Sequence, residues 1–349
     1  MTRCYARHVR LVRPARWRRV LVVVACLAAG PPAGACSSFE STPEAPNDDG
    51  GEGGDDLTEG GDASAAPDVT PGAPADASAD AGLDARCSAA TKFGAPVFVT
   101  GIDVGAQELS ALLTPDELGI VFASTRGGTY DKLYSASRTS VTAAFVDAQA
   151  LPGLTGMVDD YWAASAPWTS GTLYFCSTRP SNTIDSIFAT SVNDAGTYAP
   201  PQQVPALVNA QQLCHVHAAR HAKELWMSGS IANGNIYRAP LQADGGFAPP
   251  TPVSELNTNA RDFIPVLSDD GLVVYWASTR TDRNLGFADI WVATRTDPDG
   301  GFGGLHNVEE LNSTADDFPA WLSPDECRLY LVSGRSGMRH QLFVATRTP

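Results

Sequence analysis

The stretch Asp262-Phe-Ile-Pro-Val-Leu-Ser-Asp-Asp-Gly271 and the residues after it decide the fold of this chain. It predicts a short strand that ends in a tight turn, and Leu272 to Ser278 predict a second, apolar and aromatic strand. After a loop, Asp289-Ile-Trp-Val-Ala-Thr294 predicts a third strand. Asp297-Pro-Asp-Gly-Gly301 is a hairpin turn of the Asp-Gly kind, and Phe302 to Leu311 predict a fourth strand. Four strands in about fifty residues are typical of one blade of a β-propeller.

The same pattern occurs five times between residues 92 and 349. The second and third strands recur as pairs at 120–124 and 132–136, 173–177 and 186–190, 225–228 and 235–239, and 329–333 and 341–345. Aromatic residues open the fourth strands, at Phe93, Phe145, Tyr198, Phe247 and Phe302. The residues that open the next first strands follow 14 or 15 positions later, at Glu108, Asp160, Gln212, Asp262 and Asp317. Five equivalent units of this kind predict five blades.

The two ends of the repeat region complete one blade between them. The last copy stops at Pro349, just after its third strand, whereas a fourth-strand copy at Phe93 to Val104 stands alone before the first blade. We therefore expect the N-terminal strand to complete the C-terminal blade, which removes two sheet edges that would otherwise promote aggregation. The predicted fold is all-β, a closed five-bladed β-propeller of four-stranded blades over residues 92–349.

Residues 1–35 have the pattern of a signal peptide. Seven arginines and no acid accompany the apolar run from Val20 to Gly30, which is too short to span a bilayer. Small residues immediately before Cys36 resemble a bacterial lipobox, so Cys36 is the predicted lipidation site and membrane anchor. Ordinary cleavage after Ala35, which would release an unanchored protein, is the alternative.

Residues 36–91 are predicted to form a disordered acidic linker. Positions 37–86 contain thirteen acids, one arginine and a single aromatic residue, too little apolar surface to offset the entropy of ordering. The remaining chain, 87–349, has 26 acids and 16 bases. Such a domain is a poor partner for nucleic acid or for an anionic bilayer. We therefore expect no nucleic-acid binding, and membrane contact only through the lipid anchor.

The repeats resemble the WD40-like repeats of the TolB-type β-propeller family. Ser323-Pro-Asp-Glu326 and Asp289-Ile-Trp291 are the best-matching stretches. The resemblance covers about residues 92–349 and implies a periplasmic or surface interaction platform. We therefore expect an exported, monomeric envelope lipoprotein without a cofactor, whose partner is a protein or peptide. A lectin-like binder of cell-envelope polysaccharide is the alternative, and a five-bladed glycoside hydrolase is a third interpretation.

Four acids open predicted innermost strands and are expected to surround one mouth of the central channel: Glu108, Asp160, Asp262 and Asp317. Five-bladed glycosidases place carboxylates around such a mouth, so glycan hydrolysis is the catalytic interpretation. The structural interpretation pairs each acid with an arginine of its own blade, Arg126, Arg179, Arg280 or Arg335. The third blade has Gln212 and Ser230 instead. This joint loss of both partners favours pairing, and we predict no catalytic residue.

Three of the six histidines, His215, His217 and His221, fall within seven residues of the third blade. Alternation along a strand would put His215 and His217 on one face, within reach of zinc or copper. Packed histidines in an atypical blade are the interpretation that we favour, so no metal is predicted.

Four cysteines belong to the folded part of the chain. The predicted strand order puts Cys87 and Cys327 on the face of the first hairpin turn, and Cys176 and Cys214 on the opposite face. In an oxidising compartment the compatible pairing is Cys87 with Cys327 and Cys176 with Cys214, and buried free thiols are the alternative. The sequence has no G-x-S-x-G elbow, P-loop, C-x-x-C or dinucleotide motif that would support nucleophilic or cofactor-dependent catalysis.

Overall fold

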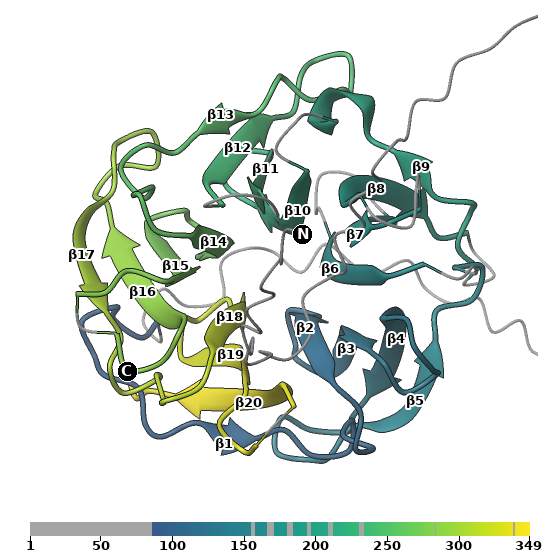
Figure 1. Cartoon of the computed structure of the whole chain (residues 1–349), viewed down its shortest axis with the longest axis horizontal. Coiled ribbons are helices and arrows are strands. Elements are labelled where there is room, and N and C mark those ends of the chain that lie inside the picture. The colour runs from purple at the N-terminus through teal and green to yellow at the C-terminus, as the bar shows by residue number, and fades with distance from the viewer. Residues whose placement is uncertain are drawn as a thin grey trace, which may run out of the picture. The chain divides into compact units, whose positions relative to one another are not determined.

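The computed structural model describes residues 86–349, apart from 155–157, 166–170, 180–183, 194–196, 209–211, 230–233, 283 and 338. Within this part the chain forms five four-stranded antiparallel sheets that surround a common axis (Figure 1). The predicted all-β, five-bladed propeller is therefore confirmed. The predicted signal peptide and the lipidation site Cys36 lie outside the described residues. None of the helices in the described ranges is long and apolar enough to cross a membrane.

Each blade runs from an innermost strand to an outer strand. Blade 1 contains β2 (Glu108–Leu113), β3 (Gly119–Ser124), β4 (Lys132–Ser137) and β5 (Val146–Ala150). Blade 2 contains β6 (Asp160–Ser165), β7 (Thr172–Ser177), β8 (Ser186–Ser191) and β9 (Gln202–Gln203), and a 3-10 helix η2 (Pro205–Leu207) follows it. Blade 3 contains β10 (Leu213–Ala219), β11 (Glu224–Gly229), β12 (Ile236–Pro240) and β13 (Thr251–Pro252). Blade 4 contains β14 (Asp262–Leu267), β15 (Val273–Ser278), β16 (Asp289–Thr294) and β17 (Gly303–Asn307).

Blade 5 combines both ends of the described chain: β18 (Asp317–Leu322), β19 (Arg328–Ser333), β20 (Gln341–Thr346) and β1 (Val97–Phe98). β1 pairs antiparallel with β20, with Val97 opposite Val344 and Phe98 opposite Phe343. The N-terminal strand therefore completes the C-terminal blade, as the repeat count predicted. The ring is closed by hydrogen bonds within one sheet as well as by packing between sheets.

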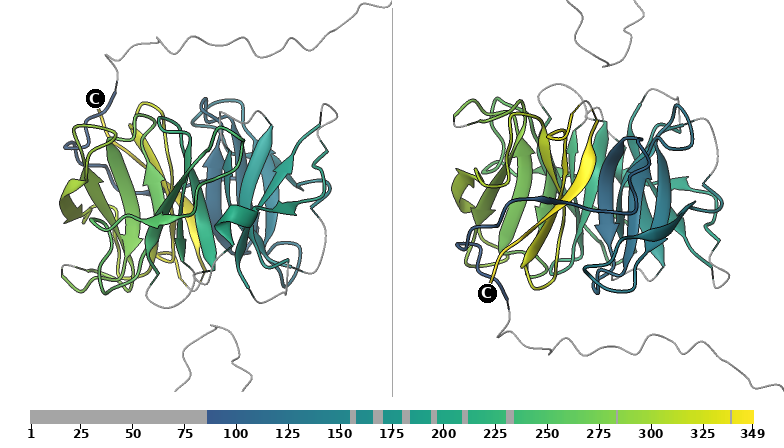
Figure 2. Two further views of the ribbon diagram at one scale, coloured as in Figure 1. Left: turned by 90° about the horizontal axis from the view of Figure 1, so that it is seen from above. Right: turned by 90° about the horizontal axis from the view of Figure 1, so that it is seen from below.

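The strands cross the thickness of a disc, so the loops gather on two faces (Figure 2). Every innermost strand begins on the face that carries Glu108, Asp160, Asp262 and Asp317, which we call the acid face. The acid face also holds the connections between blades and the loops between second and third strands. The opposite face, which we call the turn face, holds the first hairpin turn of each blade.

The apolar core lies between the blades. One cluster joins Phe122 of blade 1 to Tyr330 of blade 5, and another joins Trp226 of blade 3 to Trp276 of blade 4. All four of these rings are almost completely buried. Burial of such large side chains between neighbouring sheets is the main favourable contribution to holding the ring together.

A buried arginine follows the third strand in three blades, at Arg138, Arg295 and Arg347. Each guanidinium lies 4.3 to 4.5 Å from the centre of the ring that opens the fourth strand, which is Phe145, Phe302 or Phe93. Each Nε donates a hydrogen bond of 2.7 to 2.8 Å to a carbonyl of the first hairpin turn, at Glu117, Gly271 or Glu326. These arginines therefore connect the two ends of a blade at the turn face, a role that the sequence analysis did not assign.

Candidate functional site

The acids that open the innermost strands are buried and paired with arginines. Asp160 accepts two hydrogen bonds from Arg179, from Nη1 and Nη2, both 2.9 Å long. Asp262 accepts a hydrogen bond of 2.8 Å from Nη2 of Arg280, and a further bond of 3.2 Å from its Nε. Two-point contacts between a carboxylate and a guanidinium combine charge with defined geometry.

The same arginines also hold the loop that enters each blade. Asp317 pairs with Arg335 over 2.6 Å. In blades 1, 4 and 5, Nη2 of the arginine donates to a backbone carbonyl of that loop, at Ile102, Leu256 and Leu311 respectively. The acid–arginine pair therefore ties the second strand of a blade both to its innermost strand and to the connection from the blade before.

The burial of these acids differs from the expectation that they surround one mouth of the central channel. Asp160, Asp262 and Asp317 have no exposed surface, and Glu108 is 1% exposed. A carboxylate that is buried beside its own arginine is not free to approach a substrate. This placement agrees with the structural interpretation of the four acids.

Of the four acids, Glu108 has the weakest contacts to its carboxylate. Its Oε1 lies 3.7 Å from Nη2 of Arg126 and 3.5 Å from Oγ of Ser124. Its Oε2 is buried and has no hydrogen-bond partner among the described residues. Burial, together with the nearby charge of Asp103, raises the pKa of Glu108 to about 8.

The acid is replaced by a leucine in blade 3. Here β10 begins at Leu213, which lies opposite Gly229, just as Asp262 lies opposite Ser278 in blade 4. The prediction that Gln212 opens this strand was therefore wrong by one residue. Leu213 follows Tyr198 by 15 positions, the spacing found in the other four blades, and Ser230 lies outside the described residues.

Aromatic rings, rather than carboxylates, occupy the centre of the disc. Trp162, His215, Phe263 and Phe318 come from four successive innermost strands and form the group that we call the aromatic plug. Their ring centres are 5.1, 5.9 and 5.6 Å apart in that order. Trp162 of blade 2 also packs against the buried cluster of Phe263 and Ile264 in blade 4. Because blades 2 and 4 are not neighbours, this contact reaches across the axis.

Each of three innermost strands has a β-bulge next to or at the residue that it contributes to the aromatic plug. Trp162, His215 and Ile264 have φ angles of 51°, 49° and 55°, in the left-handed region. Each lies where two residues of the innermost strand oppose one residue of the neighbouring strand. For residues other than glycine this conformation costs about 1–2 kcal/mol, so the surrounding packing must hold it. The same bulge interrupts strand alternation, so the premise that His215 and His217 share one face was wrong.

The three clustered histidines have separate partners. Nδ1 of His215 lies 2.8 Å from Oγ of Ser228, and Nε2 of His217 accepts a hydrogen bond of 3.2 Å from the backbone nitrogen of Leu267. Nε2 of His221 accepts one of the same length from Arg295. Burial lowers the pKa of both His215 and His217 to about 3, so both rings are neutral. Across the described ranges, no group of three His, Cys, Asp or Glu side chains could hold a metal ion.

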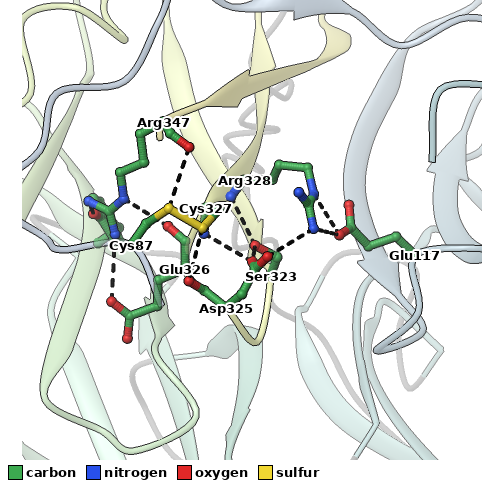
Figure 3. Close-up of a disulfide and its surroundings, with 9 residues drawn as sticks. Cys87, Glu117, Ser323, Asp325, Glu326, Cys327, Arg328 and Arg347 are labelled. Carbon is green, nitrogen blue, oxygen red and sulfur yellow. Dashed lines mark hydrogen bonds and ion pairs between the residues drawn. A yellow bond between two sulfur atoms is a disulfide. The ribbon is translucent and has the colours of Figure 1, made fainter. Parts of the chain in front are cut away.

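The structure contains two disulfides, Cys87–Cys327 and Cys176–Cys214. The first lies on the turn face next to Arg328, which forms an ion pair of 2.6 Å with Glu117 of blade 1 (Figure 3). Arg86 contacts Asp270 at 2.8 Å and Glu326 at 2.6 Å. The chain is therefore already attached to the propeller at residues 86 and 87, ahead of the predicted linker boundary at residue 91.

Exposed apolar side chains gather in the loops of the acid face. Of the ten large apolar side chains that are exposed in the described part of the chain, six lie there: Val104, Tyr130, Ile184, Val208, Leu285 and Phe287. Two others, Val141 and Val192, lie on the turn-face side, and Val97 and Val146 are on outer strands. Acids also lie in the loops of this face, among them Asp103, Asp159, Glu255 and Asp282.

Comparisons with known proteins find solved structures of low sequence identity. No family model and no curated protein matches this sequence. Solved structures that resemble it include a putative TolB from Agrobacterium tumefaciens, with 14% identity, 74% of this chain and 91% of that chain covered, and a TM-score of 0.43. They also include an α-L-arabinofuranosidase from Podospora anserina, with 12% identity, 74% and 97% covered, and a TM-score of 0.45. A glycosyl hydrolase from Bacteroides ovatus has 10% identity, 76% and 93% covered, and a TM-score of 0.45.

The fold and the buried pairs define the class of this protein: a five-bladed β-propeller whose blades are held by repeated acid–arginine contacts at one face. TolB proteins and glycoside hydrolases both occur among the similar structures. The similarity therefore does not select an activity for this chain.

Proposed function

We propose that this protein is a non-catalytic interaction platform of the bacterial envelope, and that its acid face docks a protein or peptide. The observation that carries the proposal is the concentration of exposed apolar side chains in loops of that face. Single exposed apolar residues are ordinary, but a group on one face marks an interaction surface. Loops that differ in sequence around a rigid frame are also the usual place for recognition.

The state of the buried acids supports a role without catalysis. Asp160, Asp262 and Asp317 each bind an arginine of their own blade. A general acid and its partner must both reach the substrate, whereas these carboxylates are occupied in holding strands and loops together. Glycan hydrolysis would need the pairs to open.

The proposed envelope location depends on the sequence of the leader. The arginine-rich apolar segment and the small residues before Cys36 have the pattern of an exported lipoprotein. Two disulfides in the propeller are consistent with an oxidising compartment. We propose that the lipid at Cys36 holds the protein at the membrane and that the propeller acts as a monomer without a cofactor.

Cross-linking and affinity capture from native envelope membranes would test the docking face. The full chain is compared with Val104→Asp combined with Val208→Asp, which alters two exposed positions of the acid face. The matched control is Val141→Asp combined with Val146→Asp, which alters exposed positions elsewhere. We expect one protein to be captured by the parent and the control, and its recovery to fall about tenfold with the acid-face variant.

Equal recovery of that protein by both double variants would contradict docking on the acid face. Recovery of polysaccharide or murein fragments without protein would contradict the protein-platform proposal and favour the polysaccharide alternative. A Cys36→Ser form, captured in parallel, tests the lipid anchor: we expect it to leave the membrane fraction.

A further inference from the structure

A small pocket of about 290 Å³ opens on the acid face between blades 4 and 5. Three loops that are distant in the sequence meet there, and their lining side chains include Phe287, Thr314, Asp316, Arg339 and His340. The ring of His340 lies 5.4 Å from the ring of Phe318, so the pocket adjoins the aromatic plug. Asp317 and Arg335, the buried pair of blade 5, do not line the pocket.

A neighbouring amide fixes the hydrogen-bond roles of the His340 nitrogens. Nδ1 of His340 lies 3.2 Å from Nε2 of Gln107. An amide nitrogen only donates, so Nδ1 is the acceptor and Nε2 is the nitrogen that carries a hydrogen. Nε2 is 3.7 Å from Oδ2 of Asp316, which is too long for a direct hydrogen bond. A donor and an acceptor therefore lie side by side, both partly exposed, without a direct hydrogen bond between them.

A hydroxyl group fits this arrangement because it can accept from an imidazole N–H and donate to a carboxylate at the same time. Phe287, which is 69% exposed, adds an aromatic wall at the rim. The apolar C–H face of a sugar ring packs well on such a surface. Arg339, exposed and in contact with the carbonyl of Gly105, supplies further donors.

The charges and the size of the pocket narrow the class of ligand. Asp316 and Arg339 carry opposite charges, so the pocket offers no consistent sign of charge to an ionic ligand, and an uncharged ligand with several hydroxyl groups can bond to both. A volume of about 290 Å³ is enough for one sugar ring and too small for a helix or a strand. We infer that this pocket binds a single uncharged pyranose unit of a glycan.

This inference goes beyond protein docking and does not depend on it. The pocket shares Phe287 with the apolar surface of the acid face, but Val104 and Val208, the positions altered in the docking test, do not line it. A variant can therefore lose sugar binding and keep protein docking, or the reverse.

Titrations of the full chain with free glucose, galactose, mannose and N-acetylglucosamine, followed by saturation-transfer NMR, test the inference. We expect saturable binding of at least one sugar in the millimolar range. Asp316→Asn should weaken that binding about tenfold, because the side chain keeps its size but loses a charged acceptor. Phe287→Ala should have a similar effect through loss of the aromatic wall.

Leu285→Ala is the matched control, since Leu285 is 51% exposed in the same loop as Phe287 but does not line the pocket. It should leave sugar binding unchanged. Thermal unfolding of each variant establishes that it is folded. Absence of saturation transfer from all four sugars, or equal binding by Phe287→Ala and Leu285→Ala, would overturn the inference.

Discussion

One methylene group distinguishes Glu108 from the aspartates at the equivalent position of three other blades. Asp160 and Asp317 reach their arginines at 2.9 and 2.6 Å, whereas the separation of Glu108 from Arg126 is 3.7 Å. The longer side chain therefore buries a carboxylate without forming a close ion pair. An ionised group in that position is stabilised less in the folded state than in water.

The pH dependence of stability should reveal this residue. The pKa of Glu108 is raised from 4.5 to about 8 in the folded state, so the folded protein binds this proton more tightly than the unfolded chain. Its contribution is most favourable below pH 4.5 and is lost as the pH rises through 8. We expect Glu108→Gln to have a higher free energy of unfolding than the parent at pH 9, and a similar one at pH 4.5. Urea unfolding at both pH values is the measurement, and an equal difference at both would contradict it.

The paired aspartates should respond differently to substitution. Asp317→Asn or Arg335→Ala leaves one buried partner uncompensated, which costs about 3–5 kcal/mol of unfolding free energy. Replacing both, as Asp317→Leu with Arg335→Met, should cost less than the sum of the two single changes. Blade 3, which has Leu213 at the position of the acid, already shows that an apolar residue is accepted there. Additive losses in a double-mutant cycle would argue that the two side chains act independently.

At the scale of strands, blade 3 replaces the missing ion pair with a covalent link. Cys214 of β10 is bonded to Cys176 of β7, so the innermost strand of blade 3 is attached to the blade before it. In blades 1, 4 and 5 an arginine makes the corresponding attachment to the entering loop, as with Arg280 and Leu256. The disulfide therefore lies where the repeated polar contact is absent.

Removal of each disulfide should have a different effect. The two bonds close segments of 240 and 38 residues. Because the entropy of loop closure grows with the logarithm of loop length, losing Cys87–Cys327 should cost about 1–2 kcal/mol more than losing Cys176–Cys214. Paired Cys→Ser variants, compared by urea unfolding, measure this difference.

Hydrogen exchange tests whether Cys176–Cys214 stabilises β10 in particular. When this disulfide is removed, the backbone amides of β10 should lose protection before those of the other strands. Uniform loss of protection over all strands would contradict a local role.

The strands themselves were predictable from the sequence because apolar runs and Asp-Gly turns repeat with a constant spacing. The length of the outer strands was not. β9 and β13 have only two residues each, and prolines at Pro200, Pro201, Pro249 and Pro250 limit the backbone donors beside them. The aromatic plug was also missed, because strict alternation along a strand cannot anticipate the bulges at Trp162 and His215. The small pocket was missed because its three loops meet only in the folded chain.

For the molecule as a whole, the ring closes through three contacts near one place. β1 pairs with β20, Cys87 is bonded to Cys327, and Arg86 contacts Asp270 and Glu326. The four acids predicted from the repeat were correctly located at one face, since equivalent positions in a closed ring must share a face. Their burial was not foreseen, because the sequence alone does not show how closely the entering loops cover them.

The order of these contacts along the chain determines how the molecule responds to pulling. Cys87 precedes β1 in the chain and is bonded to Cys327, which lies beside β19. A pulling force applied through residue 86 therefore acts on this disulfide first. It does not reach the two residue pairs between β1 and β20 while the disulfide is intact. A covalent bond then carries the load, and the closing strand is not peeled from its sheet. In single-molecule force measurements, we expect detachment of β1 at low force only after reduction of the disulfide. The propeller is therefore built to remain closed while it is held by its N-terminal end.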